Sequence, residues 1–255
     1  MKYYHQLVLI GCFLCAFFLM SGSAMAALTE IRASREVRVY WQEGDCWGEE
    51  GCDVWVDEDS QQTNELGTFE ATAKFDDYPK NMMAYQSSYI VVDNDKIELT
   101  AEGQAYSKHN YVEDWEDYEA ESSISLGFTI DQNYSFSLSG KLKGDVSRVT
   151  LEKYDPNYHQ PYYPEVHWKP IYNIHGSTTE PTTLDESFIL SEGRYYFSLY
   201  VHAVEDCYDN MKEGSFENIY LIIQPAASVP IPQSLWLLLT GSIFLLLYTK
   251  YRTMA

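Results

Sequence analysis

Apolar and polar residues alternate with a period of two along much of the chain, whereas a helical period of 3.6 residues is rare between the two ends. The alternating segments are rich in β-branched and aromatic residues, which favour strands. They lie at residues 36–41, 67–75, 88–92, 96–105, 122–130, 134–142, 146–152, 194–204 and 218–223. Short connections rich in Asn, Asp and Gly join several of them, as in tight hairpins. The pattern therefore predicts an all-β fold, an antiparallel β-sandwich of jelly-roll-like type.

Two stretches interrupt the strand pattern. Residues 46–65 are acidic and rich in turn-forming residues, and residues 154–186 contain five prolines. Proline cannot donate a hydrogen bond within a central strand, so we expect both stretches to be surface loops. Since no Gly/Ser linker divides the region, the sequence predicts one extracellular domain over residues 27–225.

The N-terminal segment has the layout of a secretory signal peptide. Lys2 precedes an apolar run over residues 7–20, and small residues follow up to Ala26. We therefore expect residues 1–26 to be a signal peptide that is cleaved after Ala26. Two alternatives are an uncleaved anchor, for which the run is short, and a lipoprotein box that ends at Cys12.

The C-terminal segment is apolar and ends in positive charges. Residues 218–249 contain no charged side chain, and Pro232 suits the first turn of a helix. A helix over residues 232–249 would be about 27 Å long at 1.5 Å per residue, close to the hydrocarbon thickness of a bilayer. The sequence thus predicts a single transmembrane helix, with Lys250 and Arg252 on the cytoplasmic side.

The part between the two ends is strongly acidic. It holds all 38 Asp and Glu residues but only 14 of the 17 Lys and Arg residues, which gives a net charge of −24. Such a charge repels nucleic acid and anionic membrane surfaces. We therefore expect no nucleic-acid partner.

Loss of the signal peptide would leave three of the five cysteines, Cys46, Cys52 and Cys207, in a compartment where disulfides persist. Cys46 and Cys52 enclose a short glycine-containing segment, and we expect a disulfide between them. Cys207 would then be a buried free thiol or form an intermolecular bridge, unless it takes part in a different pairing. Zinc is not expected, because no second close pair of ligands accompanies these cysteines.

Aromatic residues gather among the prolines of residues 154–172. Flat rings on stiff loops can stack on sugar faces, and the candidates for glycan binding are Tyr158, Tyr162, Tyr163 and Trp168. The alternative is that these rings pack over the edge of the sandwich. The sequence favours this alternative, because the chain holds 22 tyrosines and a local excess is weakly informative.

Metal and catalytic motifs are weak. His159, His167 and His175 are equally spaced, but proline-broken backbone does not place them together, so no metal site is predicted there. Two acidic runs have carboxylates that could bind calcium, although such runs are usually solvated faces. The first run is Asp53, Asp57, Glu58 and Asp59, and the second is Glu113, Asp114, Glu116 and Asp117. No nucleophile elbow, metalloprotease motif or phosphate loop occurs, so we expect no enzyme and no other cofactor.

The C-terminal residues resemble a known sorting signal. The elements in order are a box of Val229, Pro230, Ile231 and Pro232, the apolar stretch, and the basic residues Lys250 and Arg252. Residues 229–255 are similar to the PEP-CTERM signal in its Val-Pro-x-Pro variant. The resemblance implies recognition by an exosortase, a membrane protease of Gram-negative bacteria. It also implies export, at least transient anchoring in the inner membrane, and association with exopolysaccharide and biofilm at the cell surface.

The leading hypothesis is an exported surface or matrix protein, sorted by an exosortase, with a structural or adhesive role in extracellular polysaccharide. One alternative is a protein that binds or cleaves glycans through residues 154–172. The other is a surface protein that a single transmembrane helix anchors permanently.

Overall fold

The computed structural model describes residues 27–46, 52–76, 80–93, 95–109, 115–144, 146–159, 167–204 and 212–226. The chain divides into a unit that ends at Pro225 and a second unit, Ala226–Ala255. The predicted signal peptide, the Val-Pro-Ile-Pro box and the predicted transmembrane helix all lie outside the described residues. Among the residues that are described, no helix has the length and hydrophobicity needed to cross a membrane.

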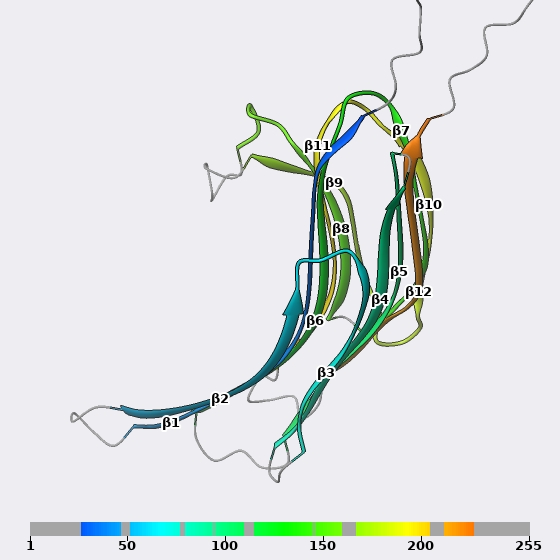
Figure 1. The fold of residues 1–255 in the computed structure, drawn as a ribbon. Coiled ribbons are helices and arrows are strands. Elements are labelled where there is room, and N and C mark those ends of the chain that lie inside the picture. The colour runs from blue at the N-terminus through cyan, green and yellow to red at the C-terminus, as the bar shows by residue number, and fades with distance from the viewer. Residues whose placement is uncertain are drawn as a thin grey trace, which may run out of the picture. The chain divides into compact units, whose positions relative to one another are not determined.

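Twelve strands make up the described part of the chain, and they form two six-stranded antiparallel sheets (Figure 1). The first sheet has the order β2-β1-β6-β11-β8-β9. Its strands are β2 (Cys52–Thr63), β1 (Leu28–Cys46), β6 (Trp115–Ile130), β11 (Gly193–Val204), β8 (Ser147–Tyr154) and β9 (Trp168–His175). The second sheet has the order β10-β7-β12-β5-β4-β3. Its strands are β10 (Thr182–Leu190), β7 (Tyr134–Lys143), β12 (Lys212–Pro225), β5 (Lys96–His109), β4 (Lys80–Asp93) and β3 (Gly67–Phe75).

The core lies between the two sheets and follows from the alternation in the sequence. On β6 every second residue from Tyr118 to Ile130 is buried, and the residues between them face outward. Rings from the two sheets meet in this layer: Phe136 of β7 and Phe197 of β11 have ring centroids 6.4 Å apart. The buried side chains of both sheets form one hydrophobic cluster. The prediction of an all-β fold with two antiparallel sheets is confirmed, and the arrangement is that of a β-sandwich.

Two of the predicted loops contain strands. The stretch 46–65 includes β2, and the stretch 154–186 includes β9 and most of β10, so the loop prediction is wrong for these segments. All three strands lie at sheet edges and have one neighbour each, β1, β8 and β7. An edge strand tolerates charge on β2 and a proline such as Pro170 on β9, because half of its backbone groups need no partner strand. A pattern that excludes a central strand therefore does not exclude an edge strand.

A buried arginine connects β1 to the segment between β2 and β3. Arg35 is 1% exposed, and its Nη1 donates a hydrogen bond to the carbonyl oxygen of Gly67 at 2.7 Å. Its Nη2 donates to the carbonyl oxygen of Glu65, and the guanidinium lies over the Phe69 ring at 5.4 Å from the centroid. These contacts fix the backbone next to Asn64, which lines the hollow described below.

Candidate functional site

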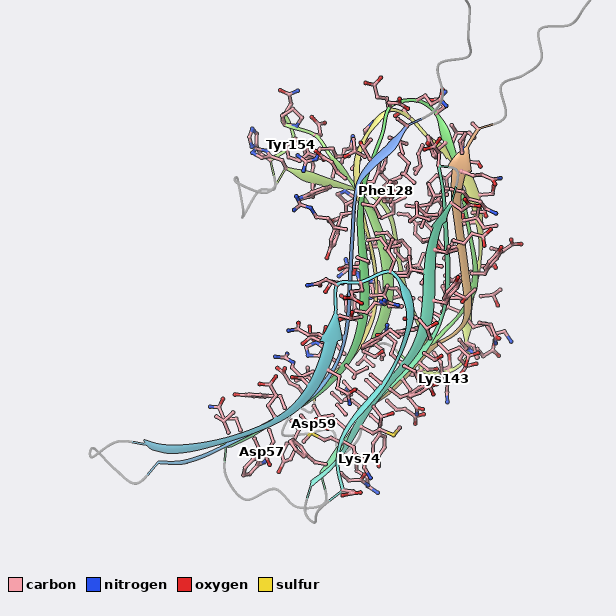
Figure 2. All side chains as sticks on the ribbon, viewed as in Figure 1. Asp57, Asp59, Lys74, Phe128, Lys143 and Tyr154 are labelled. Carbon is pink, nitrogen blue, oxygen red and sulfur yellow. The ribbon has the colours of Figure 1, made fainter. Side chains whose placement is uncertain are left out.

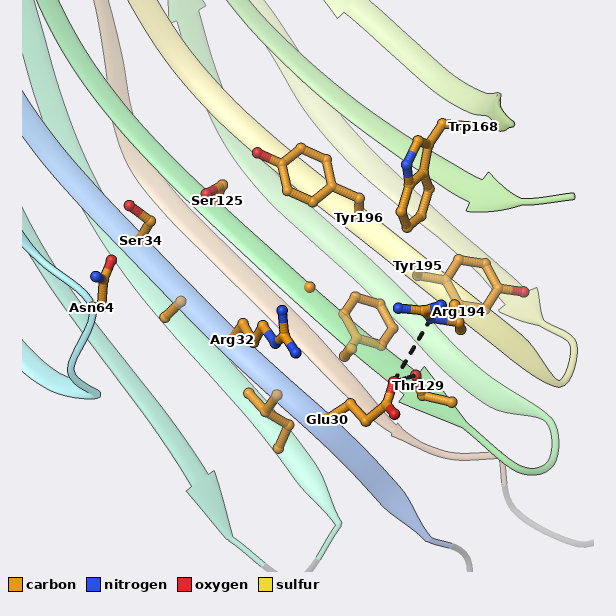
Figure 3. A pocket seen from close by; sticks show the side chains of 14 residues that line it. Glu30, Arg32, Ser34, Asn64, Ser125, Thr129, Trp168, Arg194, Tyr195 and Tyr196 are labelled. Carbon is orange, nitrogen blue, oxygen red and sulfur yellow. Dashed lines mark hydrogen bonds and ion pairs between the residues drawn. The ribbon is translucent and has the colours of Figure 1, made fainter. Parts of the chain in front are cut away.

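A hollow of about 600 Å³ lies on the outward face of the first sheet, and we call it the β1–β6–β11 groove (Figure 3). Its floor is made of residues that lie opposite one another on neighbouring strands. Arg32 of β1 pairs with Gly127 of β6, and Gly127 pairs in turn with Tyr196 of β11. Ser34 and Ser125 form the next pair on the same face of β1 and β6. The remaining described lining residues are Glu30, Ile31, Ala33, Asn64, Phe128, Thr129, Trp168, Arg194 and Tyr195. Four strands thus contribute to one concave surface of a size typical of ligand sites.

The centre of the floor has no side chain. A Cβ atom at Gly127 would meet a single heavy atom within 4 Å, the Cβ of Arg32 at 4.0 Å. The space above Gly127 is therefore open, while its register partners on the two neighbouring strands are the large residues Arg32 and Tyr196. A glycine within a strand often marks a place where a ligand approaches the backbone closely.

Aromatic rings form one wall of the groove. Trp168, at the start of β9, and Tyr196 of β11 have ring centroids 6.0 Å apart. Tyr154, the register partner of Trp168 on β8, contacts the indole edge-on at 5.6 Å. The Trp168 side chain is half-buried and Tyr196 is exposed, so both rings are held by neighbours while part of their surface faces the groove (Figure 3).

A charged pair closes one end. Glu30 accepts a hydrogen bond from the Thr129 hydroxyl at 3.1 Å, and its Oε2 lies 3.7 Å from Nε of Arg194. The Arg194 guanidinium also lies over the Tyr154 ring at 5.6 Å from the centroid. Glu30 has a positive φ of 53°, at an irregularity in the β1–β6 register between Thr29 and Arg32. Positive φ costs free energy for a non-glycine residue, and such strain concentrates at functional sites.

Arg32 differs from this pair. Its side chain is exposed, and it has no hydrogen bond or ion pair with any residue that the structure describes. Since Arg32 has no partner among the described residues, the groove presents one unpaired cation next to aromatic and hydroxyl groups.

Glu152 of β8 is the register partner of Tyr196 on the side away from Gly127. Burial raises the pKa of the Glu152 carboxyl group, and the positive charge of Arg148 opposes this rise.

The predicted glycan-binding residues are divided by the structure. Trp168 lines the groove, whereas Tyr158 lies in the β8–β9 connection, where its carbonyl oxygen is 3.0 Å from Nδ1 of His167. Tyr162 and Tyr163 lie outside the described residues. The Trp168 indole contacts Tyr154 on the neighbouring strand β8, and the same indole also forms the groove wall.

Apart from Trp168, the sequence analysis identified none of the described groove residues, among them Glu30, Arg32, Gly127, Arg194 and Tyr196. Their positions carry a weak pattern: Arg194 and Tyr196 alternate with the buried Tyr195 and Phe197, so both face outward on one strand. Gly127 interrupts the outward residues of β6. Only the register, however, places these strands side by side.

The described residues contain no group of three His, Cys, Asp or Glu side chains that could hold a metal. His159 and His167 do meet, with ring centroids 5.1 Å apart, whereas His175 lies at the other end of β9. Figure 2 shows Asp57 and Asp59 far from Tyr154 within the two sheets. Asp59 there accepts a hydrogen bond from the Lys74 backbone N–H at 3.1 Å. The other predicted calcium ligands, apart from Glu58, have side chains outside the described residues.

The backbone register bears on the predicted disulfide. Cys46 and Cys52 pair directly at the end of the β1–β2 hairpin. Opposed residues in antiparallel strands have Cα atoms about 4.5–5.5 Å apart, within the range that a disulfide spans. The bridge stays a prediction, because both side chains and all of Cys207 lie outside the described residues.

A second hollow, of about 500 Å³, lies on the outward face of the other sheet, between Tyr89 and Tyr220. Among its described lining residues, Glu102 is the one that carries a charge. The described part of this lining lacks the combination of clustered rings, an open glycine floor and an unpaired cation, so we regard the β1–β6–β11 groove as the stronger candidate.

No protein-family model matches this chain, and no curated protein is similar to it in sequence.

Proposed function

We propose that this protein is an exported surface protein that binds glycan in the β1–β6–β11 groove and has an adhesive role in extracellular polysaccharide. The observation that carries the proposal is the position of the Trp168 and Tyr196 rings beside the open floor at Gly127. A sugar ring has an apolar C–H face and an edge of hydroxyl groups. The aromatic rings suit the face, and Ser34, Ser125 and Asn64 suit the hydroxyls.

The groove favours binding over cleavage. Glycoside hydrolysis uses two carboxyl groups about 5–9.5 Å apart on either side of the bond. Glu30 is the one carboxylate among the described lining residues, and it lies in an ion pair with Arg194. We therefore propose a non-enzymatic role.

The two ends of the chain support the cellular part of the proposal. The signal-peptide pattern of residues 1–26 would export the domain. The Val229–Pro232 box, the apolar stretch and the terminal basic residues would hold it at the inner membrane until an exosortase acts. Each of the two prolines favours extended backbone at the residue before it, and a protease needs extended backbone.

The strand order, in which β6 lies beside β11 and β5 beside β12, supports a jelly-roll-like topology.

The glycan-binding proposal is tested on a glycan array with the full-length protein. We expect the wild-type protein to bind glycan, and we expect Trp168→Ala to lower the affinity at least tenfold. Tyr89→Ala is the matched control, because it removes an exposed ring from the other sheet. Binding that tolerates Trp168→Ala, or that Tyr89→Ala reduces as much, would contradict the assignment of the groove.

The sorting proposal is tested by intact-mass analysis of the surface protein in its native host. We expect loss of the segment from about Pro232 onward, and retention of that segment when the exosortase is deleted. If the full tail persists at the surface in both strains, a permanent single-span anchor replaces sorting.

A further inference from the structure

We infer that the glycan bound in the β1–β6–β11 groove carries carboxylate groups, so that the ligand is a uronic-acid polysaccharide. The inference rests on the proposed glycan-binding function and adds the chemical class of the sugar. It depends on the position and environment of Arg32.

Arg32 stands apart from the other described arginines. Arg38 lies 3.1 Å from Glu119, and Arg194 lies 3.7 Å from Glu30. Arg35 donates to backbone carbonyls, and Arg148 donates to Asn173 at 2.8 Å. Acidic residues outnumber basic ones more than twofold in this chain, so an internal partner for Arg32 would be easy to supply. Its guanidinium is instead left exposed inside a groove.

The local charge also differs from that of the whole domain. Glu30, Arg32 and Arg194 are the charged residues among the described lining residues, and Glu30 neutralises Arg194. The groove thus keeps one positive charge in a region of the chain that carries −24. At physiological ionic strength the Debye length is about 8 Å, so exposed carboxylates farther away are largely screened, whereas a contact pair is not.

The spacing across the floor suits a single sugar ring. Arg32 and Tyr196 are two strands apart with Gly127 between them, and neighbouring strands lie about 4.8 Å apart, which separates their backbones by roughly 10 Å. A sugar ring over Gly127 would contact Tyr196 and Trp168 on one side. Its carboxylate would then point toward Arg32, whose planar fork of donors matches a carboxylate with two parallel hydrogen bonds.

The test compares polymers that differ in the carboxylate alone. The full-length protein is titrated with polygalacturonate and with carboxyl-reduced polygalacturonate, and dextran sulfate is included as a polyanion without carboxylates. The variants are Arg32→Gln, which removes the charge, and Arg32→Lys, which keeps it without the fork. Lys141→Gln is the matched control, because Lys141 is an exposed cation on the other sheet.

We expect polygalacturonate to bind at least tenfold more tightly than its reduced form, and Arg32→Gln to remove that difference. Arg32→Lys should recover part of it, and Lys141→Gln should leave it unchanged. Equal binding of both polymers, abolished by Trp168→Ala, would overturn the uronate inference while the glycan-binding function stands. Dextran sulfate that binds as tightly as polygalacturonate would also overturn it. If no polymer and no array glycan binds, the proposed function and the inference both fail.

Discussion

Substitution of Gly127 by valine should block the groove while the fold is retained. Gly127 lies in the middle of β6, and its φ is outside the left-handed region, so an L-residue fits the backbone there. The nearest heavy atom to an added Cβ would be the Cβ of Arg32 at 4.0 Å, an ordinary van der Waals contact. The valine methyl groups would then occupy the groove floor.

The expected change in stability is small and favourable. β-branched residues are preferred to glycine in strands, on a scale that spans about 1 kcal/mol. For a domain of this size, 1 kcal/mol corresponds to about 2–4 °C in Tm. We therefore expect Gly127→Val to unfold at the same temperature as the wild type or up to about 4 °C higher.

The expected loss of binding is large. A gap of 0.5–1 Å already removes about a quarter to a half of a dispersion contact, and a valine on the floor would lift a sugar ring by more than that. We expect at least a tenfold loss of glycan affinity for Gly127→Val and a smaller loss for Gly127→Ala. Thermal denaturation and titration with the same glycan, on the same preparations, separate the two effects.

Gly103 provides the structural contrast. A Cβ there would lie 2.2 Å from Cζ of Phe216, which is fully buried on β12. Overpacking of this kind typically costs about 1–3 kcal/mol, so Gly103→Ala should lower Tm. If Gly127→Val unfolds like Gly103→Ala, the space over β6 is not open. If it folds and binds glycan like the wild type, the groove is not the binding site.

Three further predictions concern other parts of the chain. Non-reducing peptide mapping of the exported protein should find Cys46 joined to Cys52, and free thiols at both positions, or either joined to Cys207, would contradict the bridge. Burial raises the pKa of Tyr134 and of Tyr172 to about 12. The unfolded chain therefore loses these two phenol protons at a lower pH than the folded protein. The contribution of the two tyrosines to stability, which is complete below pH 10, should be lost as the pH rises from about 10 to 12. Denaturant unfolding at pH 9 and at pH 11.5 should show this loss, on the order of 2 kcal/mol for Tyr134, and Tyr134→Phe should reduce it; an unchanged midpoint would refute it. N-terminal sequencing should find the mature chain starting at Ala27, whereas a start at Met1 would show that the first segment is an anchor.

The edge strands mark one limit of the sequence analysis. The alternation of residues 122–130 and 194–204 predicted the central strands β6 and β11, because a half-buried strand must alternate to bury one face. The edge strands β2, β9 and β10 were missed, since a strand with one neighbour tolerates charge and proline. Alternation of apolar and polar residues reflects the burial of one strand face, and these edge strands bury few side chains.

The groove marks the other limit. The sequence alone determined the all-β fold class, the alternating segment 194–204 that contains Arg194 and Tyr196, and the presence of an indole at residue 168. It did not determine that β1, β6, β11 and β9 contribute to one surface, because their order in the sheet depends on pairings between residues far apart in the chain. Arg32 and Tyr196 are separated by more than 160 residues and become neighbours across Gly127 only through two strand registers. Tertiary structure decided the site because register is fixed by which faces the two sheets bury against each other, a property of the whole sandwich and of no single segment.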